Sequence, residues 1–369
     1  MVIKEYTITQ LEEFIYSDIF KKSAVIPITT LRAISHINNP RASREDIVLI
    51  VAFENDDIIG YIGILPDNIF VENTELKIGW ISCWWTDNIK GKTIALELFF
   101  KALEVWDNNI LITDLIPKTK FIVDKTDEFF YTEKIRGIRG FLRFNLNTIL
   151  PSKHDFYKRI IILLQVIDFT CNLINEVRLF IRTFIRKFSE KNKNIKVQFV
   201  DSIDEEISSF INLHSSDEII RRQKSELNWV KNYPWISNTD SSKTEGKKYY
   251  FSSYAKIFEN NFLKIFNNGT LVGFMMVSQR NEHLRIPYIF FDKTNTSIIV
   301  KVIYDILTSK KISMFTTFNP FITEYIKNNP SPFFYKRKIY KDLAVSYKFQ
   351  HLNLKNVILQ DGDGDCAFT

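Results

Sequence analysis

The hexapeptide at positions 88–93 has the residue types and the setting of a phosphate-binding turn. Its residues are Asn88, Ile89, Lys90, Gly91, Lys92 and Thr93. It follows the β-prone run 76–85 and precedes a segment with helical spacing, so a strand is expected to give way to a helix here. The first N–H groups of a helix lack partners within it, and the helix dipole places positive charge beside them. Gly91 permits close approach of the backbone, and Lys90 and Lys92 add charge, so this turn is predicted to cradle a phosphate.

The segment after the turn has the pattern of a helix with one buried face. Apolar residues recur there at intervals of three and four. They are Ile94, Ala95, Leu98, Phe99, Ala102, Leu103 and Trp106. Glu97, Lys101 and Glu104 fall on the opposite face. The sequence therefore predicts a helix over 93–106 whose buried side anchors the turn.

The same landmarks recur about 204 residues further along the chain, which indicates two copies of one α/β module. The landmarks are an apolar helix pattern, a proline after a β-prone run, and a Tyr-x-x-Lys spacing. They fall at 94–103 and 298–307, at Pro117 and Pro320, and at Tyr131-x-x-Lys134 and Tyr335-x-x-Lys338. The turn itself differs, because the second copy reads Asp292-Lys-Thr-Asn295-Thr-Ser297, which has an acid and no glycine. The second copy is therefore not expected to hold a phosphate.

Each copy is predicted to form one sheet with helices on it. The order in both is strand, helix, β-hairpin, strand, helix, strand, short helix and closing strand. In the first copy Thr9 is the expected N-cap of the first helix, 54–57 is the hairpin turn, and 141–146 is the closing strand. In the second copy the hairpin turns at 267–269 and 343–349 closes the sheet. The predicted fold is α/β (α+β), with a mixed, mostly antiparallel sheet flanked by helices in each copy.

Length and composition agree with two such domains. The chain has 369 residues, and 45% of them are hydrophobic, which is enough for two packed interiors. The predicted organisation is an N-terminal domain at 1–150, a helical linker at 151–193, a C-terminal domain at 194–349 and an acidic tail at 350–369.

Cysteine usage and charge limit the class of protein. Cys83, Cys171 and Cys366 are odd in number and widely spaced, so they suit neither a disulfide framework nor a zinc site. Charged residues at Lys4 and Glu5 interrupt the run that a signal peptide would need, and a cytoplasmic protein is predicted. The net charge of +6 fits an anionic ligand but does not by itself indicate DNA binding. The histidines have no metal-ligand spacing, so no metal is predicted.

At the turn and the elements around it, the chain resembles the GCN5-related N-acetyltransferase (GNAT) superfamily. The acyl-CoA signature of that superfamily is Gln/Arg-x-x-Gly-x-Gly/Ala, entered from a strand and followed by an amphipathic helix. Asn88, Gly91 and Thr93 hold its three defined positions here, so the glycine alone is a strict match. The resemblance covers about residues 1–150. It implies two tandem GNAT-like domains and acetyl-CoA, or another acyl-CoA, as the cofactor.

The resemblance also implies binding residues on the strand before the turn. In GNAT enzymes that strand splays from its neighbour and its backbone binds pantetheine. By position, this role falls on Ser82, Cys83 and Trp84.

The second copy resembles the same fold without its cofactor motif. A tandem arrangement of this kind is similar to Fem-type aminoacyl transferases and to acyltransferases of envelope polysaccharides. The segments 227–234 and 271–274 and the acidic ending 361–365 carry this further similarity. It implies an amine acceptor, for example an amino sugar or an aminoacyl group.

Two residues are candidates for acid–base chemistry. Tyr131 stands where many GNAT enzymes place a general acid for the departing thiolate, although a packing tyrosine is the alternative because Tyr335 recurs in the second copy. Asp114 follows a strand and could act as a base through water, or it could be a surface turn residue. Cys83 has no histidine close in sequence and is expected to be a small apolar filler rather than a nucleophile.

The linker and the tail each leave two interpretations open. The segment 155–187 is helical in pattern, and it is either a connector packed on the domains or an amphipathic helix on an anionic membrane surface. The basic residues for the second case are Arg178, Arg182, Arg186 and Lys187. The tail lacks the glycine and glutamate that an EF-hand needs, so it is either solvated or tucked into a cleft, where its carboxylates would attract a cationic amine.

The function predicted from these features is acyl-CoA-dependent N-acyl transfer to an amine. Two alternatives remain: a non-catalytic binding protein that keeps the fold, and a Fem-type transferase that uses charged tRNA. The sequence does not indicate the oligomeric state.

Overall fold

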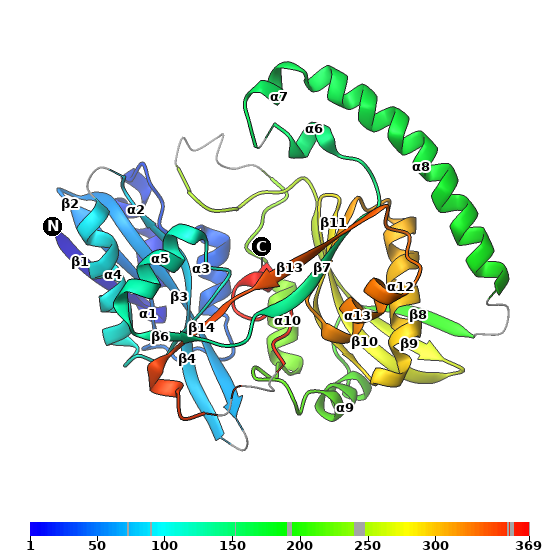
Figure 1. Cartoon of the computed structure of the whole chain (residues 1–369). Coiled ribbons are helices and arrows are strands. Elements are labelled where there is room, and N and C mark those ends of the chain that lie inside the picture. Colours follow the sequence, from blue (N-terminus) through cyan, green and yellow to red (C-terminus); the bar gives the residue numbers. More distant parts are fainter. Residues whose placement is uncertain are drawn as a thin grey trace. The chain divides into compact units, whose positions relative to one another are not determined.

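The chain forms two compact units, and each unit draws on segments from both halves of the sequence (Figure 1). The computed structural model describes residues 1–369 except 72–73, 89–90, 152, 190–193, 240–247, 353, 355–357 and 369, and except the side chains of 91–92, 183 and 185–189. The first unit comprises Met1–Ile135, Asp201–Asn261 and Tyr340–Thr369. The second unit comprises Arg136–Val200 and Phe262–Ile339.

The first unit is built on a seven-stranded sheet in the order β1-β2-β3-β4-β5-β14-β6. Its strands are β1 (Val2–Thr7), β2 (Ile47–Glu54), β3 (Asp57–Val71), β4 (Thr74–Thr86), β5 (Ile110–Thr113), β6 (Phe129–Tyr131) and β14 (Leu343–Ser346). The pair β4–β5 is parallel, and the other described pairs are antiparallel. The sheet is therefore mixed and mostly antiparallel, as predicted.

Helices cover both faces of this sheet because the residues of its strands alternate between two cores. On β2, Leu49 and Val51 belong to a core with the first three helices, whereas Ile50 and Ala52 belong to a core with α4 and α5. The helices of the unit are α1 (Ile8–Tyr16), α2 (Asp18–Lys22), α3 (Thr30–Ile37), α4 (Gly91–Val105), α5 (Pro117–Thr126), α9 (Glu205–His214), α10 (Lys224–Asn232), and the short turns η2 (Tyr347–Phe349) and η3 (Cys366–Phe368).

The second unit repeats this plan. Its seven-stranded sheet has the order β8-β9-β10-β11-β12-β7-β13. The strands are β8 (Ile195–Val200), β9 (Phe258–Asn267), β10 (Thr270–Arg280), β11 (His283–Phe291), β12 (Met314–Thr317), β7 (Ile135–Phe141) and β13 (Tyr335–Lys341). The helices are α12 (Thr296–Ser309) and α13 (Pro320–Asn328), which share a core with the sheet, together with η1 (Lys293–Asn295), α6 (Leu146–Ile149), α7 (Phe156–Arg159) and α8 (Ile161–Ser189).

The duplication is confirmed at the level of the elements, with one exchange of strands that the sequence did not predict. After the exchange the two sheets have the same strand order, with β14 between β5 and β6 in one and β7 between β12 and β13 in the other. The prediction that 141–146 closes the first sheet is wrong. The strand of the first copy ends at Phe141 and pairs with β12, while Leu343 to Val345 of the second copy pair with β5. The predicted domain ranges 1–150, 151–193, 194–349 and 350–369 describe the repeat in the sequence and stay a prediction. The compact units have other boundaries, because each contains a strand from the other copy.

Local signals mostly placed the elements correctly. The predicted hairpin turns carry left-handed backbone at Asn55, Asp56, Asn268 and Gly269, as tight hairpins require. The expected N-cap was two residues late, because the Thr7 side chain, not that of Thr9, accepts the hydrogen bond that begins α1. In the described part of the chain, no helix is long and apolar enough to cross a membrane.

Candidate functional site

Strand β4 carries a bulge between Ser82 and Trp85. Ser82 pairs with Gly63 and Trp85 pairs with Tyr61, so two residues of β4 lie opposite one residue of β3. Cys83, inside the bulge, has left-handed backbone with φ of 55°. A bulge of this kind takes backbone groups out of the ladder and turns the strand.

Strand β4 also separates from β5 before it ends. The parallel ladder pairs Gly79 with Ile110 and Trp80 with Leu111, and among the described residues it includes no later pair. Because β4 continues to Thr86, its last part has no strand partner on that side. The splayed strand that the resemblance implied is thus present, and the bulge lies within its splayed part.

Helix α4 begins directly beyond this strand. It starts at Gly91, two residues before the predicted start at Thr93, and it is anchored by Ile94, Leu98 and Phe99 in the core. The ring of Trp84 stacks on Phe99, with centroids 5.0 Å apart and planes 7° apart, and so ties the bulge to the helix.

The predicted cradle residues are described only in part. Asn88 and Thr93 are exposed, while Ile89 and Lys90 and the side chain of Lys92 lie outside the described part of the chain. Their roles remain predictions.

A buried arginine lies against the bulge. Arg32 of α3 is 2% exposed, and its Nη2 donates to Ser82 Oγ over 2.8 Å. Its Nη1 contacts the Cys83 thiol and donates to the Tyr249 hydroxyl at 3.3 Å. A Cβ on Gly63 would lie 2.9 Å from Arg32 Nη2, so glycine at this position allows the guanidinium to approach the sheet.

Aromatic groups complete the surroundings of Arg32. Its guanidinium carbon lies 4.1 Å from the ring centre of Trp235, and its Nε donates to His36 Nε2 over 3.4 Å. Burial, and then the charge of Arg32, lower the pKa of His36 well below its usual value. The imidazole is therefore neutral, which agrees with its acceptor role at Nε2.

The cluster holds one fixed positive charge. Burial by itself lowers the pKa of Arg32, but nearby Cys83, Tyr249 and Asp365 raise it above its usual value, so the guanidinium stays charged. Burial raises the pKa of the Cys83 thiol and of the Tyr249 hydroxyl. The Cys83 sulfur is accordingly a thiol rather than a thiolate, and it makes polar contacts with Arg32 and Tyr249 that an apolar filler would not make.

The C-terminal segment is ordered and packs where β4 and β5 separate. A Cβ on Gly364 would lie 3.0 Å from Thr113 Oγ1 on β5 and 3.6 Å from the Trp80 ring on β4. Phe368 is fully buried and stacks on Trp235, with centroids 4.6 Å apart. The solvated tail, one of the two predicted alternatives, is wrong, and the tucked-in tail is the one observed.

Side chains of this segment reach both strands. Ser82 Oγ donates to Asp365 Oδ2 on the β4 side. The Cys366 thiol donates to Asp114 Oδ2 over 3.0 Å on the β5 side, and Lys341 Nζ donates to the same sulfur over 3.2 Å. Asp114, the predicted base, is thus brought beside the tail.

A buried charged cluster fixes the start of the segment. Arg222 Nη2 lies 2.7 Å from Asp67 Oδ2, and its Nε lies 3.7 Å from Asp363 Oδ1, with all three side chains 1% exposed. Burial raises the pKa of Asp363 to about 7, against the lowering effect of Arg222. Burial, and then Asp363, raise the pKa of Glu218, whose carboxyl accepts from Gln360 at 2.6 Å. Two of the acids in this cluster, Asp363 and Glu218, therefore resist ionisation.

Tyr131, the predicted general acid, is engaged elsewhere in the first unit. Its hydroxyl donates to Asp124 Oδ1 over 2.5 Å, and its ring lies 4.3 Å from Lys120 Nζ. Burial, then the hydrogen bond with Asp124, raise its pKa above the usual value. Tyr131 and Trp84 pack against the same core of this unit, but the described hydrogen bonds of Tyr131 are not made to Ser82, Cys83 or Trp84, and its catalytic role remains a prediction.

The equivalent strand of the second unit, β11, keeps a bulge opposite Val277, and its described ladder with β12 ends at Arg285, but its residues and the turn after it differ. The Asp292 carboxylate accepts from the backbone N–H of Thr294 at 2.8 Å, so an acid occupies the turn before α12. Strand β11 has Pro287 at the place of Cys83 and includes no residue with positive φ. Proline has no N–H to offer, and the acid would repel a phosphate.

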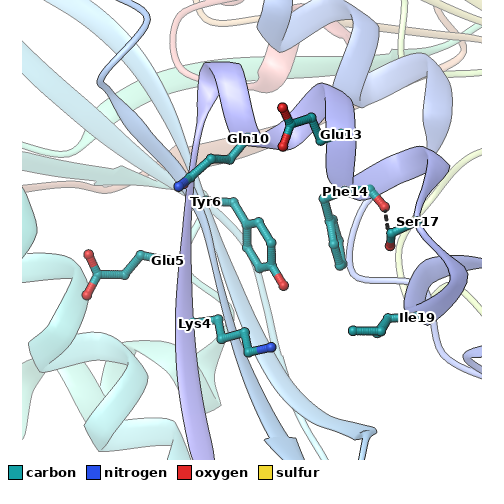
Figure 2. A pocket seen from close by; sticks show the side chains of 8 residues that line it. All are labelled: Lys4, Glu5, Tyr6, Gln10, Glu13, Phe14, Ser17 and Ile19. Carbon is teal, nitrogen blue, oxygen red and sulfur yellow. Dashed lines mark hydrogen bonds between the residues drawn. The ribbon is translucent and has the colours of Figure 1, made fainter.

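A separate open depression lies between β1 and α1 (Figure 2). Its volume is about 450 Å³. It is lined by Lys4, Glu5, Tyr6, Gln10, Glu13, Phe14, Ser17 and Ile19. None of these residues belongs to the bulge, the Arg32 cluster or the predicted cradle, so the depression is not the candidate site.

Arg32 and Tyr249 were not predicted from the sequence as site residues, whereas the acidic ending that contains Asp365 was one of the interpretations left open. Arg32 sits on the apolar face of a helix at a position that reads as core, and Tyr249 follows a polar stretch without periodicity. One signal was available: an arginine on the buried face of an amphipathic helix needs a partner, and this points to a polar group on the facing strand.

No protein-family model matches this chain, and no curated protein sequence matches it. Solved structures with a similar arrangement include GNAT-fold proteins. One is a probable N-acyltransferase from Enterococcus faecalis V583, with TM-score 0.49 and 9% identity, over 94% of this chain and 72% of that chain. Another is Saccharomyces cerevisiae N-myristoyltransferase with bound myristoyl-CoA, with TM-score 0.48 and 10% identity, over 93% and 82%.

A third similar structure is a tandem GNAT protein from the clavulanic acid biosynthesis pathway, with TM-score 0.41 and 9% identity, over 93% of this chain and 98% of that chain. The chain is therefore similar in arrangement to GNAT-fold proteins, including a tandem one. Because the TM-scores are below 0.5, the description of the fold stands on the strand order above, and any function stands on the residues of this chain.

Proposed function

We propose that this chain is an acyl-CoA-dependent N-acyltransferase and that its first unit holds the acyl-CoA. The observation that carries the proposal is the bulge at Cys83 in a strand that separates from β5 and leads into helix α4 at Gly91. In this order, the part of β4 that has no described partner on the β5 side is followed directly by the N-terminus of a helix. Such donors suit a carbonyl oxygen followed by phosphate oxygens.

The residues that would hold the cofactor are those of the strand and the turn. The backbone of Ser82, Cys83 and Trp84 would bind the pantetheine arm, and the turn 88–93 would bind the pyrophosphate. Bound acyl-CoA would supply an activated acyl thioester. The donor set fits this group, since backbone N–H groups and a helix N-terminus carry no acid that would repel it.

The acceptor would be a primary amine. The Asp365 carboxylate accepts a hydrogen bond from the Ser82 hydroxyl, and its charge raises the pKa of Arg32. A carboxylate there can hold a substrate ammonium and accept its proton, which leaves the amine nucleophilic. Arg32 would fix the orientation of that carboxylate by its charge and through the shared Ser82 hydroxyl. The acceptor class that we favour is an amino sugar or an aminoacyl group of envelope polysaccharide.

The proposal is tested by thermal unfolding of the full chain with acetyl-CoA, CoA or ATP at about 1 mM. We expect acetyl-CoA and CoA to raise the Tm by several degrees, because a ligand that binds only the folded state stabilises it. ATP is the control for non-specific polyanion binding. No shift with either CoA species, or an equal shift with ATP, would contradict the proposal.

A second candidate function is favoured by the tail. Because Gly364 packs on Trp80 and Thr113, the segment lies along the region where the two strands separate. A non-catalytic binding protein that keeps the fold would show this packing with no need of acyl-CoA. In that case the chain would give neither a thermal shift nor CoA release with any amine.

A further inference from the structure

Helix α8 presents its polar side to its own unit. Asp168 accepts hydrogen bonds from the backbone N–H groups of Leu146 and Asn147, both at 2.9 Å. Asn172 bonds to both backbone groups of Phe144, its Oδ1 accepting from N–H at 2.8 Å and its Nδ2 donating to the carbonyl at 2.9 Å. The helix is thus attached by side-chain hydrogen bonds to backbone together with the buried side chains of Leu164 and Leu179.

The charged residues of α8 take part in the same attachment. Arg178 Nη2 donates to the Pro332 carbonyl over 2.7 Å, and Arg182 Nη1 donates to the Ser331 carbonyl. Glu176 forms a 2.6 Å ion pair with Arg143. One of the two interpretations of the sequence placed Arg178 and Arg182 on a membrane surface, but their described bonds are made to their own unit.

The opposite side of α8 is apolar and exposed. Ten large apolar side chains along it are between 50% and 74% exposed. They are Ile162, Leu163, Val166, Phe169, Leu173, Ile174, Val177, Phe180, Ile181 and Phe184. On an ideal helix at 100° per residue they fill an arc of about 140°. Figure 1 shows α8 as one long green helix at the edge of the second unit. A stripe of this width normally marks the face that a helix buries.

The exposed arc contains no described polar group that needs a hydrogen-bond partner from another molecule. Its single polar residue is Thr170, whose hydroxyl already bonds to the carbonyls of Val166 and Ile167 at 3.0 and 3.1 Å. Protein–protein interfaces carry about one hydrogen bond per 100 to 200 Å². A uniformly apolar face of this length instead suits acyl chains, which make no hydrogen bonds.

A second copy of the helix is a poorer occupant. A heptad seam can be drawn with Leu163, Val177 and Phe184 at its a positions. The flanking e positions are then Ile167, Ile174 and Ile181, where coiled coils usually carry charges. The apolar arc is therefore wider than a two-helix seam needs.

The charge around the arc favours an anionic surface. The acids of the helix, Asp168 and Glu176, are bonded within the unit. Lys153, Lys158 and Arg159 are exposed just before its N-terminal end, together with Asp155, which lies 2.6 Å from Lys158 Nζ. The arc and its approach thus present apolar and mostly basic side chains, the combination found in helices that lie on anionic lipid.

We propose that α8 lies in the plane of an anionic lipid surface, with its apolar arc among the acyl chains and its polar side on the second unit. The helix would lie on the bilayer and not cross it, in agreement with the absence of a spanning helix among the described residues. This inference does not depend on the proposed acyl transfer.

The first test is co-sedimentation of the full chain with vesicles of phosphatidylcholine alone or with about 30% phosphatidylglycerol. We expect binding to the anionic vesicles, weakened several-fold by high salt. Ile174→Glu and Phe180→Glu should each reduce binding at least tenfold, because each puts a charge among the acyl chains. Gln165→Glu is the matched control, since it adds the same charge to an exposed position outside the arc, and it should bind nearly as wild type does.

The second test reports the depth of the helix directly. The described part of α8 contains no tryptophan, so Phe169→Trp provides an emission probe on the arc and Gln165→Trp provides one off it, each read as the difference from the emission of the six native tryptophans in the wild type. Anionic vesicles should shift the emission of the first to the blue and leave that of the second nearly unchanged.

Three results would overturn the proposal. One is the absence of vesicle binding by the wild-type chain when its thermal unfolding is normal. Another is unchanged binding of the two glutamate variants. The third is a concentration-dependent dimer, seen by analytical ultracentrifugation without vesicles, that Ile174→Glu dissociates. That outcome would assign the arc to a second copy.

Discussion

The guanidinium of Arg32 donates a hydrogen bond to the hydroxyl of Ser82 over 2.8 Å, and this bond joins a buried cation to the bulged strand. Ser82 in turn donates to Asp365, so a charge on α3 and a charge on the C-terminal segment share one hydroxyl. The strand that is proposed to hold the acyl group is therefore linked through side chains to both sides of the site.

Arg32→Ala is expected to destabilise the folded chain by about 3 kcal/mol, because it leaves the polar partners of a buried charge without their donor. Arg32→Lys should recover only part of the loss, since one ammonium cannot reach both Ser82 and His36 as the guanidinium does. Urea unfolding gives both values. Arg44→Ala, at an exposed position, is the control, and a loss below about 1 kcal/mol for Arg32→Ala would contradict the description of the cluster.

The stability of the chain should fall as the pH rises from about 4 to about 7 because of Asp363. Its pKa in the folded chain is about 7, above the ordinary value of 3.8, so across this window the folded state keeps a proton that the unfolded state has lost. The effect should amount to a few kcal/mol in the free energy of unfolding. Asp363→Asn removes the titrating carboxyl and should flatten this part of the curve, measured by urea unfolding at successive pH values. Equal pH slopes for the variant and the wild type would count against the buried acid.

Asp365→Asn should lower turnover and spare cofactor binding. The amide keeps the hydrogen bond from Ser82 but loses the charge that would hold an ammonium and take its proton. The measurement is CoA release from acetyl-CoA over a panel of primary amines, beside calorimetric titration of acetyl-CoA. We expect the turnover rate to fall by about two orders of magnitude, while the affinity for acetyl-CoA stays unchanged. Equal turnover by the variant would remove Asp365 from the proposed chemistry.

Tyr131→Phe should cost about 1 kcal/mol of stability, the usual worth of one hydrogen bond, because it removes the bond to Asp124. It should leave acetyl-CoA affinity unchanged. Tyr335→Phe is the matched control, since Tyr335 holds the same place in the second copy and is exposed. If Tyr131→Phe alone slowed turnover by about two orders of magnitude, the general-acid role predicted from the sequence would be restored.

Local rules explain how much of the fold could be predicted. The hairpin at Asn268 and Gly269 and the helix after Pro117 follow from backbone preferences of a few neighbouring residues, and both are present. The exchange of β7 and β14 depends on which sheet a strand joins. Strands such as Ile135–Phe141 and Leu343–Ser346 read alike from their own sequence, so only tertiary pairing decides between the sheets.

The candidate site was predictable only on its backbone side. The strand–turn–helix order around Gly91 is local and was correctly placed. The side chains that meet at the bulge come from positions far apart in the chain, such as Arg32, Tyr249 and Asp365. Their association depends on tertiary packing, which no spacing rule in the sequence contains.

The central claim, that the first unit alone binds acyl-CoA at the start of α4, is tested most directly by calorimetric titration of acetyl-CoA into three proteins. These are the wild type, Gly91→Glu and Asn295→Glu. A glutamate in the first turn is compatible with a helix, so each variant should stay folded while it places a negative charge at one of the two equivalent turns. Asn295 makes no capping hydrogen bond that would be lost.

We predict one binding event per chain for the wild type and for Asn295→Glu, and a loss of affinity of tenfold or more for Gly91→Glu. No binding by the wild type, or equal affinity in Gly91→Glu, would contradict the account.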